Sequence, residues 1–379
     1  MRVLFTAVAL PGHFFPLVPL AWAFRALGHE VLVAIPDNFV GAAVRSGLPV
    51  VSCGPALDFV DSAEGGGTVE ERRFANGRTF GEFASASLPG TLDLVRTWRP
   101  DLVVSERAEF AGPIAARVQD VPAVEFQWSV AALGEYRIAA EEVLGDTLNA
   151  LGLTELPEPA QVVTSWPASL RKQHSADHIA MRHVPYNGDS RVPSWLWEPR
   201  TRPRICFTMG TVLPHLEPAG DAVLPVLRRL AGLSAEIVVA VDDKVAAGWT
   251  GLPPAIRHCG RIPLSLVLPT CAVAIHHGGH GTALTALDAG ASQLVLPVFD
   301  DQLDNADAVV RSGAGLSLTA AEVNPESVAG RCATLIEDST FRVDAAVVAA
   351  EIASQPTPVA TAQRLYELVV NRTPRRRVA

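Results

Sequence analysis

The segment from His276 to Thr282 carries residue types that bind phosphate. It reads HHGGHGT and follows an apolar run at 273–275. Glycines let the backbone approach a bound group, and a helix N-terminus offers free N–H donors with partial positive charge. We therefore predict a diphosphate cradle between a buried strand and a helix that starts at Thr282. In this cradle His277 supplies a further donor, and Thr282 either caps the helix or contacts a phosphate oxygen. The alternative is an ordinary strand-to-helix turn with structural histidines, because the segment matches neither a Walker motif nor GxGxxG.

A second polar group lies one residue beyond the next apolar run, at 293–298, and consists of Asp300, Asp301 and Gln302. Carboxylates accept hydrogen bonds and amides both accept and donate them, so this group suits the hydroxyls of a sugar. The alternative is that the two aspartates only cap the following helix.

The elements that must position these residues alternate between strand and helix. Apolar runs predict strands at 3–10, 31–36, 49–53, 101–106 and 122–128, and again at 204–211, 236–241, 256–260, 273–279 and 293–298. Helices are predicted between them, for example at 16–27, 40–46 and 218–231. Continuous apolar strands separated by helices are typical of parallel sheets covered on both faces. The fold class is therefore α/β, with two doubly wound units whose strand ends face a shared cleft.

Two stretches depart from this alternation. Residues 55–90 begin with a glycine triplet (65–67), continue with charged residues and phenylalanines, and predict a long loop with helical pieces beside a substrate pocket. Seven prolines between 157 and 203 make 145–200 a poor helix and predict a connector between the two units.

Composition narrows the class of protein. Of 379 residues, 49% are hydrophobic and 19% charged, which is too apolar for disorder. No apolar stretch approaches the ~18–20 residues of a spanning helix, and the first apolar run is too short for a signal peptide, so we expect a cytoplasmic protein without membrane insertion. A formal net charge of −9 argues against nucleic acid as a partner. The five scattered cysteines, which form no CxxC pair, predict buried reduced thiols rather than disulfides or zinc ligands.

Longer segments resemble a known family. HHGGHGT (276–282) followed by LDAGASQLVLPVFDDQLDNA (287–306) is similar to the donor-binding signature of family 1 GT-B glycosyltransferases, especially the actinobacterial branch that attaches deoxysugars to polyketides and other antibiotics. Further matches are RVPSWLWEPRTRPRICFTMGT (191–211), RIPLSLVLPTCAVAIHHGG (261–279), AVALPGHFFPLVPLA (7–21) and QPTPVATAQRLYELV (355–369). The resemblance covers nearly the whole chain in the family's order and implies a GT-B fold with two Rossmann-like domains.

The resemblance also implies domain limits. Residues 1–195 would form the acceptor-binding domain, 196–203 the interdomain linker, and 204–355 the nucleotide-sugar-binding domain. Residues 356–372 would form a C-terminal helix that packs back on the N-terminal domain.

The donor contacts are likewise assigned by resemblance. His277 would contact the α-phosphate, and backbone N–H groups from Gly279 to Thr282 would hold the β-phosphate. The full predicted donor-binding set is Gly210, Thr211, Arg261, Ile262, Pro263, Leu264, His277, Gly278, Gly279, His280, Gly281, Thr282, Asp300, Asp301 and Gln302. His280 stands where many relatives have a small residue, so its role is left open.

Catalysis is assigned to His13, which follows Pro11-Gly12 after the first strand, where the resemblance implies a loop facing the cleft. A neutral imidazole can take the proton of an alcohol or phenol as its oxygen attacks the anomeric carbon. Relatives often place an aspartate after the strand aligned with 101–106, and the matching residue is Glu106, which would orient the imidazole. The expected reaction is a direct displacement with inversion. Because no DxD pair follows a strand, we expect turnover without a metal. The alternative for His13 alone is a loop histidine packed among Phe14 and its neighbours.

Aromatic residues on candidate pocket segments are the predicted acceptor contacts, namely Phe14, Phe59, Phe83 and Trp128, with Phe74 and Phe80 beside them. Such rings stack on a flat polyketide, but they serve equally as core. The chain starts almost directly at its first strand, without the extra N-terminal sequence of activator-dependent macrolide-type relatives. We therefore expect a self-sufficient enzyme that acts on an aromatic polyketide.

The sequence thus predicts a glycosyltransferase that moves a deoxyhexose from a TDP-sugar to a hydrophobic aglycone, forming an O- or C-glycoside, with no cofactor beyond the nucleotide-sugar co-substrate. A homodimer is left open. Two alternatives remain: a UDP-sugar epimerase, and a catalytically weak transferase-like helper protein.

Overall fold

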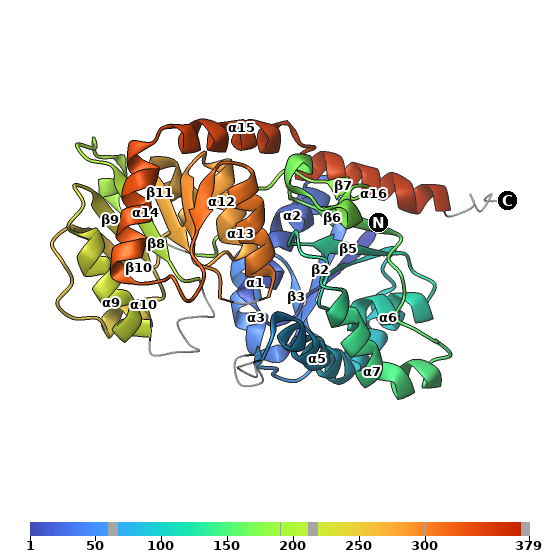
Figure 1. The fold of residues 1–379 in the computed structure, drawn as a ribbon. Coiled ribbons are helices and arrows are strands. Elements are labelled where there is room, and N and C mark those ends of the chain that lie inside the picture. The colour runs from blue at the N-terminus through green and yellow to red at the C-terminus, as the bar shows by residue number, and fades with distance from the viewer. Residues whose placement is uncertain (60–66, 190, 211–218, 299, 373–379) are drawn as a thin grey trace.

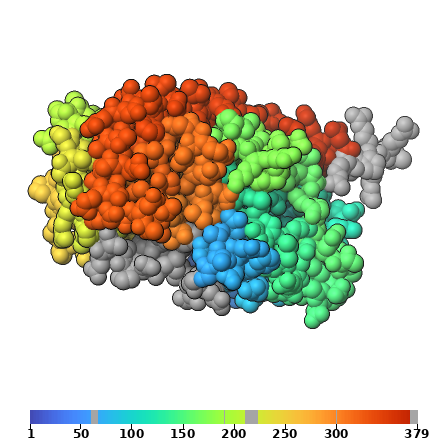
Figure 2. All heavy atoms as spheres, in the orientation of Figure 1, coloured from blue at the N-terminus to red at the C-terminus, as the bar shows by residue number. Residues whose placement is uncertain are grey.

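Two parallel α/β units make up the chain (Figure 1). The computed structural model describes residues 1–59, 67–189, 191–210, 219–298 and 300–372. The N-terminal unit, blue to green, lies beside the C-terminal unit, yellow to orange, and the two are in contact on the face drawn in Figure 2. This architecture confirms the predicted fold class of two Rossmann-like sheets. None of the described helices combines the length and apolarity needed to cross a membrane.

The first sheet has the strand order β3-β2-β1-β4-β5-β6-β7, with parallel neighbours throughout. Its strands are β1 Arg2–Thr6, β2 Glu30–Ile35, β3 Val50–Ser52, β4 Leu102–Glu106, β5 Ala123–Gln127, β6 Gln161–Thr164 and β7 Ile179–Ala180. Val3, Leu4 and Phe5 of β1 have no exposed surface, which explains the unbroken apolar run in the sequence. The strand order reverses between β1 and β4, and such a switch point opens a crevice at the carboxyl ends of the strands.

The helices of this unit are α1 Pro11–Phe14, α2 Val18–Ala26, α3 Asp37–Ala43, α5 Val69–Trp98, α6 Ala111–Val118 and α7 Gly134–Ala150. The predicted first strand at 3–10 is too long, because the chain turns into α1 at Pro11. His13 therefore lies on a short helix rather than on a loop.

The predicted loop over 55–90 is wrong for most of its length, because α5 is one helix of 30 residues. A capping box starts it: Glu71 N donates to Thr68 Oγ1 (3.2 Å), and Thr68 N donates to Glu71 Oε2 (2.7 Å). The charged residues that looked like loop form the exposed first turns. Buried residues then recur at helical spacing, from Phe80 through Ala84 and Leu88 to Val95, and this face packs on α6 and α7.

The predicted connector over 145–200 is also wrong in its first part. β6 and β7 lie within it and extend the first sheet beyond β5. The prolines at 157, 159 and 167 flank β6 instead of marking a linker. Farther on, Leu196 is buried in the core of the C-terminal unit with Cys206 and Ile262.

The second sheet has the order β10-β9-β8-β11-β12-β13, again parallel. Its strands are β8 Arg204–Thr208, β9 Glu236–Ala240, β10 Ile256–Gly260, β11 Val273–His276, β12 Ser292–Val295 and β13 Gly315–Ser317. Its helices are α9 Ala219–Leu230, α10 Asp243–Ala247, α11 Leu264–Val267, α12 His280–Asp288, α13 Asp301–Arg311, α14 Pro325–Glu337 and α15 Thr340–Ser354. The order reverses between β8 and β11, so this unit also has a crevice beyond its strand ends.

The last helix, α16 Pro358–Arg372, returns to the first unit after α15 has passed along the second (Figure 1). It packs on α2, and its Ala362, Leu365 and Val369 belong to the buried core of the N-terminal unit. The two units are therefore joined at both ends of the C-terminal domain.

Candidate active site

The carboxyl ends of β1 and β4 bring His13 and Glu106 together. β1 and β4 are adjacent strands, so α1 after β1 and the last residue of β4 meet at one edge of the sheet. His13 Nδ1 lies 3.0 Å from Glu106 Oε2, within hydrogen-bond distance. The sequence prediction paired the same two residues, and the extra methylene of glutamate relative to aspartate does not prevent the contact.

Glu106 is 1% exposed, and three N–H donors from the described residues bind its carboxylate. Oε2 accepts from Trp128 Nε1 at 2.9 Å and from Ala108 N at 2.8 Å, while Oε1 accepts from Val8 N at 3.2 Å. Burial by itself raises the pKa of Glu106, but the His13 imidazole and these donors outweigh it and hold the pKa below its usual value. The carboxylate is therefore ionised at neutral pH and suited to stabilise a charged imidazole.

The loop after β11 is shaped by a buried histidine and a glycine. His276 Nδ1 accepts from Gly278 N at 3.1 Å, which leaves the proton on Nε2, 2.8 Å from Gln293 Oε1. Burial lowers the pKa of His276 to about 4, so the imidazole is neutral. Gly278 has φ +90°, and a Cβ there would lie 2.9 Å from the Gln302 carbonyl oxygen.

The N-terminus of α12 is the predicted phosphate-binding element. Gly279 is its N-cap and His280 its first residue, which corrects the predicted start at Thr282 and the predicted cap by that threonine. The first intrahelical hydrogen bond runs from Ala283 N to the Gly279 carbonyl oxygen. The N–H groups from 280 to 282 thus have no partner within the helix, as an anion site requires.

The His277 imidazole lies between two glycines. A Cβ on Gly210 would lie 2.4 Å from its Cε1, and a Cβ on Gly279 would lie 2.4 Å from its Nε2. Burial, followed by the neighbouring His276, lowers the pKa of His277 to about 3, so the ring is neutral and donates from one nitrogen. The glycines at 210 and 279 are therefore needed to seat this histidine as well as to approach a ligand.

A cavity of about 450 Å³ lies between the two units at these loops. Its N-terminal side includes Pro11, Gly12, Phe15, Pro16, Phe39 and Arg45, and the segment 183–187 also lines it. From the predicted donor set it is lined by Gly210, Arg261, Ile262, Leu264, His277, Gly279, His280, Gly281 and Thr282. Pro263 is the N-cap of α11, and Gly278 is buried behind the loop. Thr211 lies outside the described residues.

His280 lies where the two units meet. Its ring packs on Trp128 with centroids 5.0 Å apart, and its Nδ1 is 4.0 Å from Asp301 Oδ2. Burial, then the nearby His13 and His183, lowers the pKa of His280 to about 3. This neutral imidazole therefore connects the cavity wall to the aromatic cluster around His13.

The predicted sugar-binding residues begin α13. Asp301 Oδ2 accepts from Asn305 Nδ2 at 2.8 Å, and burial together with the carboxylate of Asp300 raises the pKa of Asp301 to about 7. Gln302 is buried, and its Oε1 accepts from Val298 N at 3.0 Å. Asp300 differs from the expectation, because its carboxylate accepts from Tyr136 and Asn76 of the N-terminal unit. Its side chain does not cap α13.

The predicted acceptor residues divide into two groups. Phe14 has no exposed surface and packs on Phe39, with ring centroids 6.0 Å apart, so it is a core residue and the prediction is corrected. Trp128 lies 4.8 Å from the His13 ring, and Phe80 lies 5.7 Å from it.

Phe59 and Phe83 reach His13 only through Phe80. The Phe59 ring stacks on Phe80 at 5.3 Å, and Phe83 meets it edge-on at 6.4 Å. All four predicted acceptor side chains are at least nine-tenths buried in this structure.

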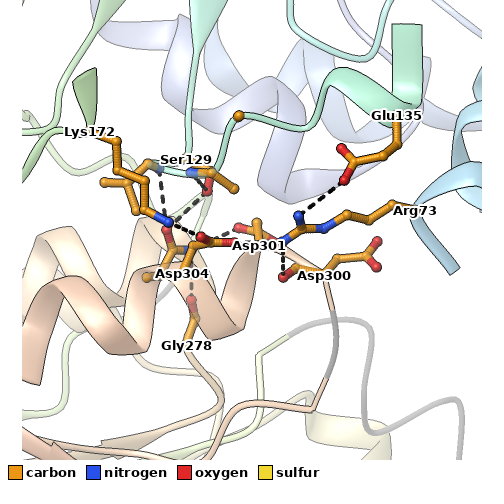
Figure 3. A network of polar contacts seen from close by, with 12 residues as sticks. Arg73, Ser129, Glu135, Lys172, Gly278, Asp300, Asp301 and Asp304 are labelled. Carbon is orange, nitrogen blue, oxygen red and sulfur yellow. Dashed lines mark hydrogen bonds and ion pairs between the residues drawn. The ribbon is translucent and has the colours of Figure 1, made fainter. Parts of the chain in front are cut away.

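Sequence reasoning missed Asn305, which connects the two units inside the site. Its Nδ2 donates to the Gly278 carbonyl oxygen at 2.9 Å, and its Oδ1 accepts from Ser129 Oγ at 3.0 Å. The residue is completely buried, and Figure 3 labels its two partners, Ser129 of the N-terminal unit and Gly278 of the C-terminal unit. An amide four residues after Asp301, one turn along a helix, was the only signal in the sequence.

His183 was missed as well. It lines the cavity, and its Nε2 lies 3.1 Å from Thr285 Oγ1, whose hydroxyl donates to the Gly281 carbonyl oxygen. Burial lowers the pKa of His183 to about 4. Nothing in the sequence separates this residue from the proline-rich stretch around it.

No group of three or more His, Cys, Asp or Glu side chains that is suited to a metal ion occurs in the described ranges. The five cysteines are all free, three of them buried and two, Cys259 and Cys271, partly buried.

Comparison with known proteins places this geometry in a family. Residues 72–210 match the N-terminal domain model, and residues 225–368 the C-terminal domain model, described as erythromycin biosynthesis protein CIII-like. The chain is 38% identical to an L-demethylnoviosyl transferase of Streptomyces niveus, over 96% of this chain and 97% of that protein.

Solved structures agree over almost the whole chain. The glycosyltransferase SsfS6 of Streptomyces sp. SF2575, complexed with thymidine diphosphate, is 35% identical with a TM-score of 0.85, covering 97% of this chain and 99% of that one. The spinosyn rhamnosyltransferase SpnG, complexed with spinosyn aglycone, is 32% identical with a TM-score of 0.86, covering 97% and 100%. The chain therefore belongs to the erythromycin biosynthesis protein CIII-like family and is a GT-B glycosyltransferase that uses a nucleotide-activated sugar.

Proposed function

We propose that this enzyme transfers a deoxyhexose from a thymidine diphosphate sugar to a hydrophobic polyketide-type acceptor, with inversion and without a metal. The attacking atom is a hydroxyl oxygen or an activated ring carbon. The observation that carries the proposal is the His13–Glu106 contact of 3.0 Å, next to Gly12, which lines the cavity together with the N-terminus of α12.

In the proposed reaction His13 acts as the general base. Its Nδ1 faces Glu106, so Nε2 takes the acceptor proton while the acceptor attacks the anomeric carbon from the face opposite the leaving group. The bond between the anomeric carbon and the diphosphate oxygen breaks, and the nucleoside diphosphate leaves with the electron pair. The buried Glu106 carboxylate stabilises the imidazolium that forms.

The leaving group is stabilised by the opposite wall. The free N–H groups at 280–282 and the positive end of the α12 dipole face the diphosphate, and the neutral His277 adds one donor. These contacts supply stabilisation of the kind a metal ion provides in other transferases, which supports metal-independent turnover.

The choice of thymidine over uridine and the class of acceptor rest on the relatives. One solved relative carries thymidine diphosphate and another a spinosyn aglycone. The buried aromatic rings packed around His13 make the surroundings of the base apolar, which supports an apolar acceptor.

The test is calorimetric titration with TDP and UDP in EDTA, followed by turnover measurements with TDP-deoxysugars and a panel of polyketide aglycones. We expect micromolar TDP binding that His277→Ala weakens, whereas His13→Ala keeps nucleotide affinity and loses turnover. Tighter binding of UDP would move the donor to a UDP-hexose. If folded protein binds neither nucleotide, the proposed donor is refuted and a helper protein is favoured. A helper protein is also favoured if His13→Ala leaves the activity unchanged.

A further inference from the structure

Asp300, directly before the predicted sugar-binding residues Asp301 and Gln302, has an unusual backbone conformation. Its φ is +51° and its ψ is −121°, although it is not a glycine. Such a conformation costs about 1–3 kcal/mol and persists only where surrounding contacts hold it. What holds Asp300 therefore also sets the direction in which α13 begins.

The groups that hold Asp300 come from the acceptor domain. Tyr136 Oη donates to Asp300 Oδ2 at 2.7 Å, and Asn76 Nδ2 donates to the same oxygen. Arg73 donates from a terminal guanidinium nitrogen to the Asp300 carbonyl oxygen at 3.1 Å. Arg73 and Asn76 lie one turn apart on α5, and Tyr136 lies on α7, which packs against α5. Tyr136 and Asp300 are 4% and 3% exposed, so water does not compete for this contact.

A second set of contacts holds Asp304, in the first turn of α13. Arg73 also binds Asp304 Oδ2 at 2.5 Å, Lys172 pairs with the other oxygen of Asp304, and Glu135 lies 3.5 Å from Arg73. Figure 3 shows Arg73 reaching the start of α13 from the right, with Lys172 and Glu135 above it. The first turn of α13 is thus fixed by the domain that does not carry the nucleotide loop.

The same contact connects to the catalytic base. The Tyr136 ring packs on Phe80 with centroids 5.2 Å apart, and Phe80 packs on His13 at 5.7 Å. The Tyr136 ring therefore belongs to the aromatic cluster around His13, and its hydroxyl binds Asp300, directly before α13. Oδ1 of Asp300 is buried and has no hydrogen-bond partner in the described part of the chain, so Oδ2 alone anchors this carboxylate.

We infer that Tyr136, Asn76 and Arg73 are positioning residues for the donor sugar. They act through Asp300 on the segment 301–302, and this inference rests on the proposed function. The acceptor domain completes the sugar subsite, while the nucleotide subsite is built by the C-terminal domain. Loss of these contacts changes recognition of the sugar and leaves recognition of the nucleotide intact.

The experiment compares Tyr136→Phe with Tyr366→Phe, a matched hydroxyl deletion at a partly exposed position of α16. Calorimetry gives the Kd of TDP and of TDP-glucose for each protein, and their ratio measures what the sugar contributes. We expect Tyr136→Phe to change this ratio about tenfold, the effect of one hydrogen bond to a charged group, with TDP affinity within about twofold of wild type. Tyr366→Phe leaves both constants unchanged.

Hydrogen exchange supplies a second readout that does not depend on the sugar chosen. In Tyr136→Phe the amides of 300–305 exchange faster than in wild type, whereas those of α12 do not. Asn76→Ala removes the other donor to the same oxygen and serves if Tyr136→Phe does not fold.

If Tyr136→Phe leaves the ratio of the two Kd values unchanged, the inference is overturned, because the contacts then serve stability alone. This holds whether or not the amides of 300–305 exchange faster. The inference also fails if the wild-type protein binds TDP-glucose no more tightly than TDP. Absence of TDP binding by wild type would instead refute the proposed function, so the two failures are distinguishable.

Discussion

Replacing Glu106 with glutamine tests the proposed catalytic dyad of His13 and Glu106 with little change in shape. If glutamine places its oxygen at the Oε2 position, it still accepts from Trp128 and Ala108 and stays next to His13 Nδ1. Its amide then faces the Val8 N–H, at present 3.2 Å from Oε1, and one hydrogen bond is lost. The imidazole tautomer is kept, and what disappears is the negative charge.

The magnitude follows from the geometry. Two unit charges at the observed 3.0 Å attract by about 5.5 kcal/mol at an effective dielectric constant of about 20. The amide dipole of glutamine restores part of this attraction, so we expect a loss of roughly 3–5 kcal/mol in transition-state stabilisation. At about 1.4 kcal/mol per tenfold, kcat falls by about 10²–10⁴.

The assay is steady-state turnover with a TDP-deoxysugar and its best acceptor, combined with TDP calorimetry and chemical unfolding. We expect an unchanged TDP Kd and a free energy of unfolding lower by about 1–3 kcal/mol, for the one unsatisfied buried N–H. Glu125→Gln, on the neighbouring strand β5, is the control for a carboxylate-to-amide change away from the base. A kcat within fivefold of wild type in folded Glu106→Gln would refute the reasoning.

Three further predictions follow from buried groups. Burial raises the pKa of Glu109 to about 7, above an unfolded value of ~4.3, so its stabilisation is complete at low pH and is lost as pH rises through 7. Denaturant unfolding between pH 5 and pH 8 should show a decline of about 3 kcal/mol from this group, and an equal decline in Glu109→Gln would contradict the assignment. Gly279→Ala places a Cβ 2.4 Å from His277 Nε2 and should weaken TDP binding at least ~10-fold by calorimetry, whereas Gly145→Ala, with open space around it, should not; equal affinities would argue against the seating role. Asn305→Ala leaves buried partners in both domains unsatisfied and should lower the free energy of unfolding by about 2 kcal/mol, measured by denaturation, and a neutral effect would show that water replaces the amide.

The fold class, and the meeting of His277 and Gly279 to Thr282 at one cavity, could be predicted from the sequence because those features depend on local patterns. Apolar strands such as β1 and β11 are buried on both faces, and glycines beside His277 mark a close backbone approach. The helix α5 was missed because its first turns are exposed and charged and follow a glycine triplet. Only the spacing of Phe80, Ala84 and Leu88 revealed its helical face.

Contacts between residues far apart in the chain were not predictable from one sequence. Asn305 and Ser129 are 176 positions apart, and Tyr136 and Asp300 are 164 apart. Nothing in their local sequence shows that these pairs meet. Phe14 is a second kind of example. Its residue type and its place in the sequence fit a pocket residue equally well, and only its packing against Phe39 shows that it belongs to the core.

The return of α16 to the N-terminal domain limits how such enzymes can be recombined. A hybrid made by one crossover near residue 200 would take α16 from one parent and the α2 surface beneath it from the other. Ala362, Leu365 and Val369 would then face a core that they did not evolve with, and packing mismatches in a core are costly. A functional hybrid therefore requires two crossovers, the second after α15, so that the N-terminal domain keeps its own terminal helix.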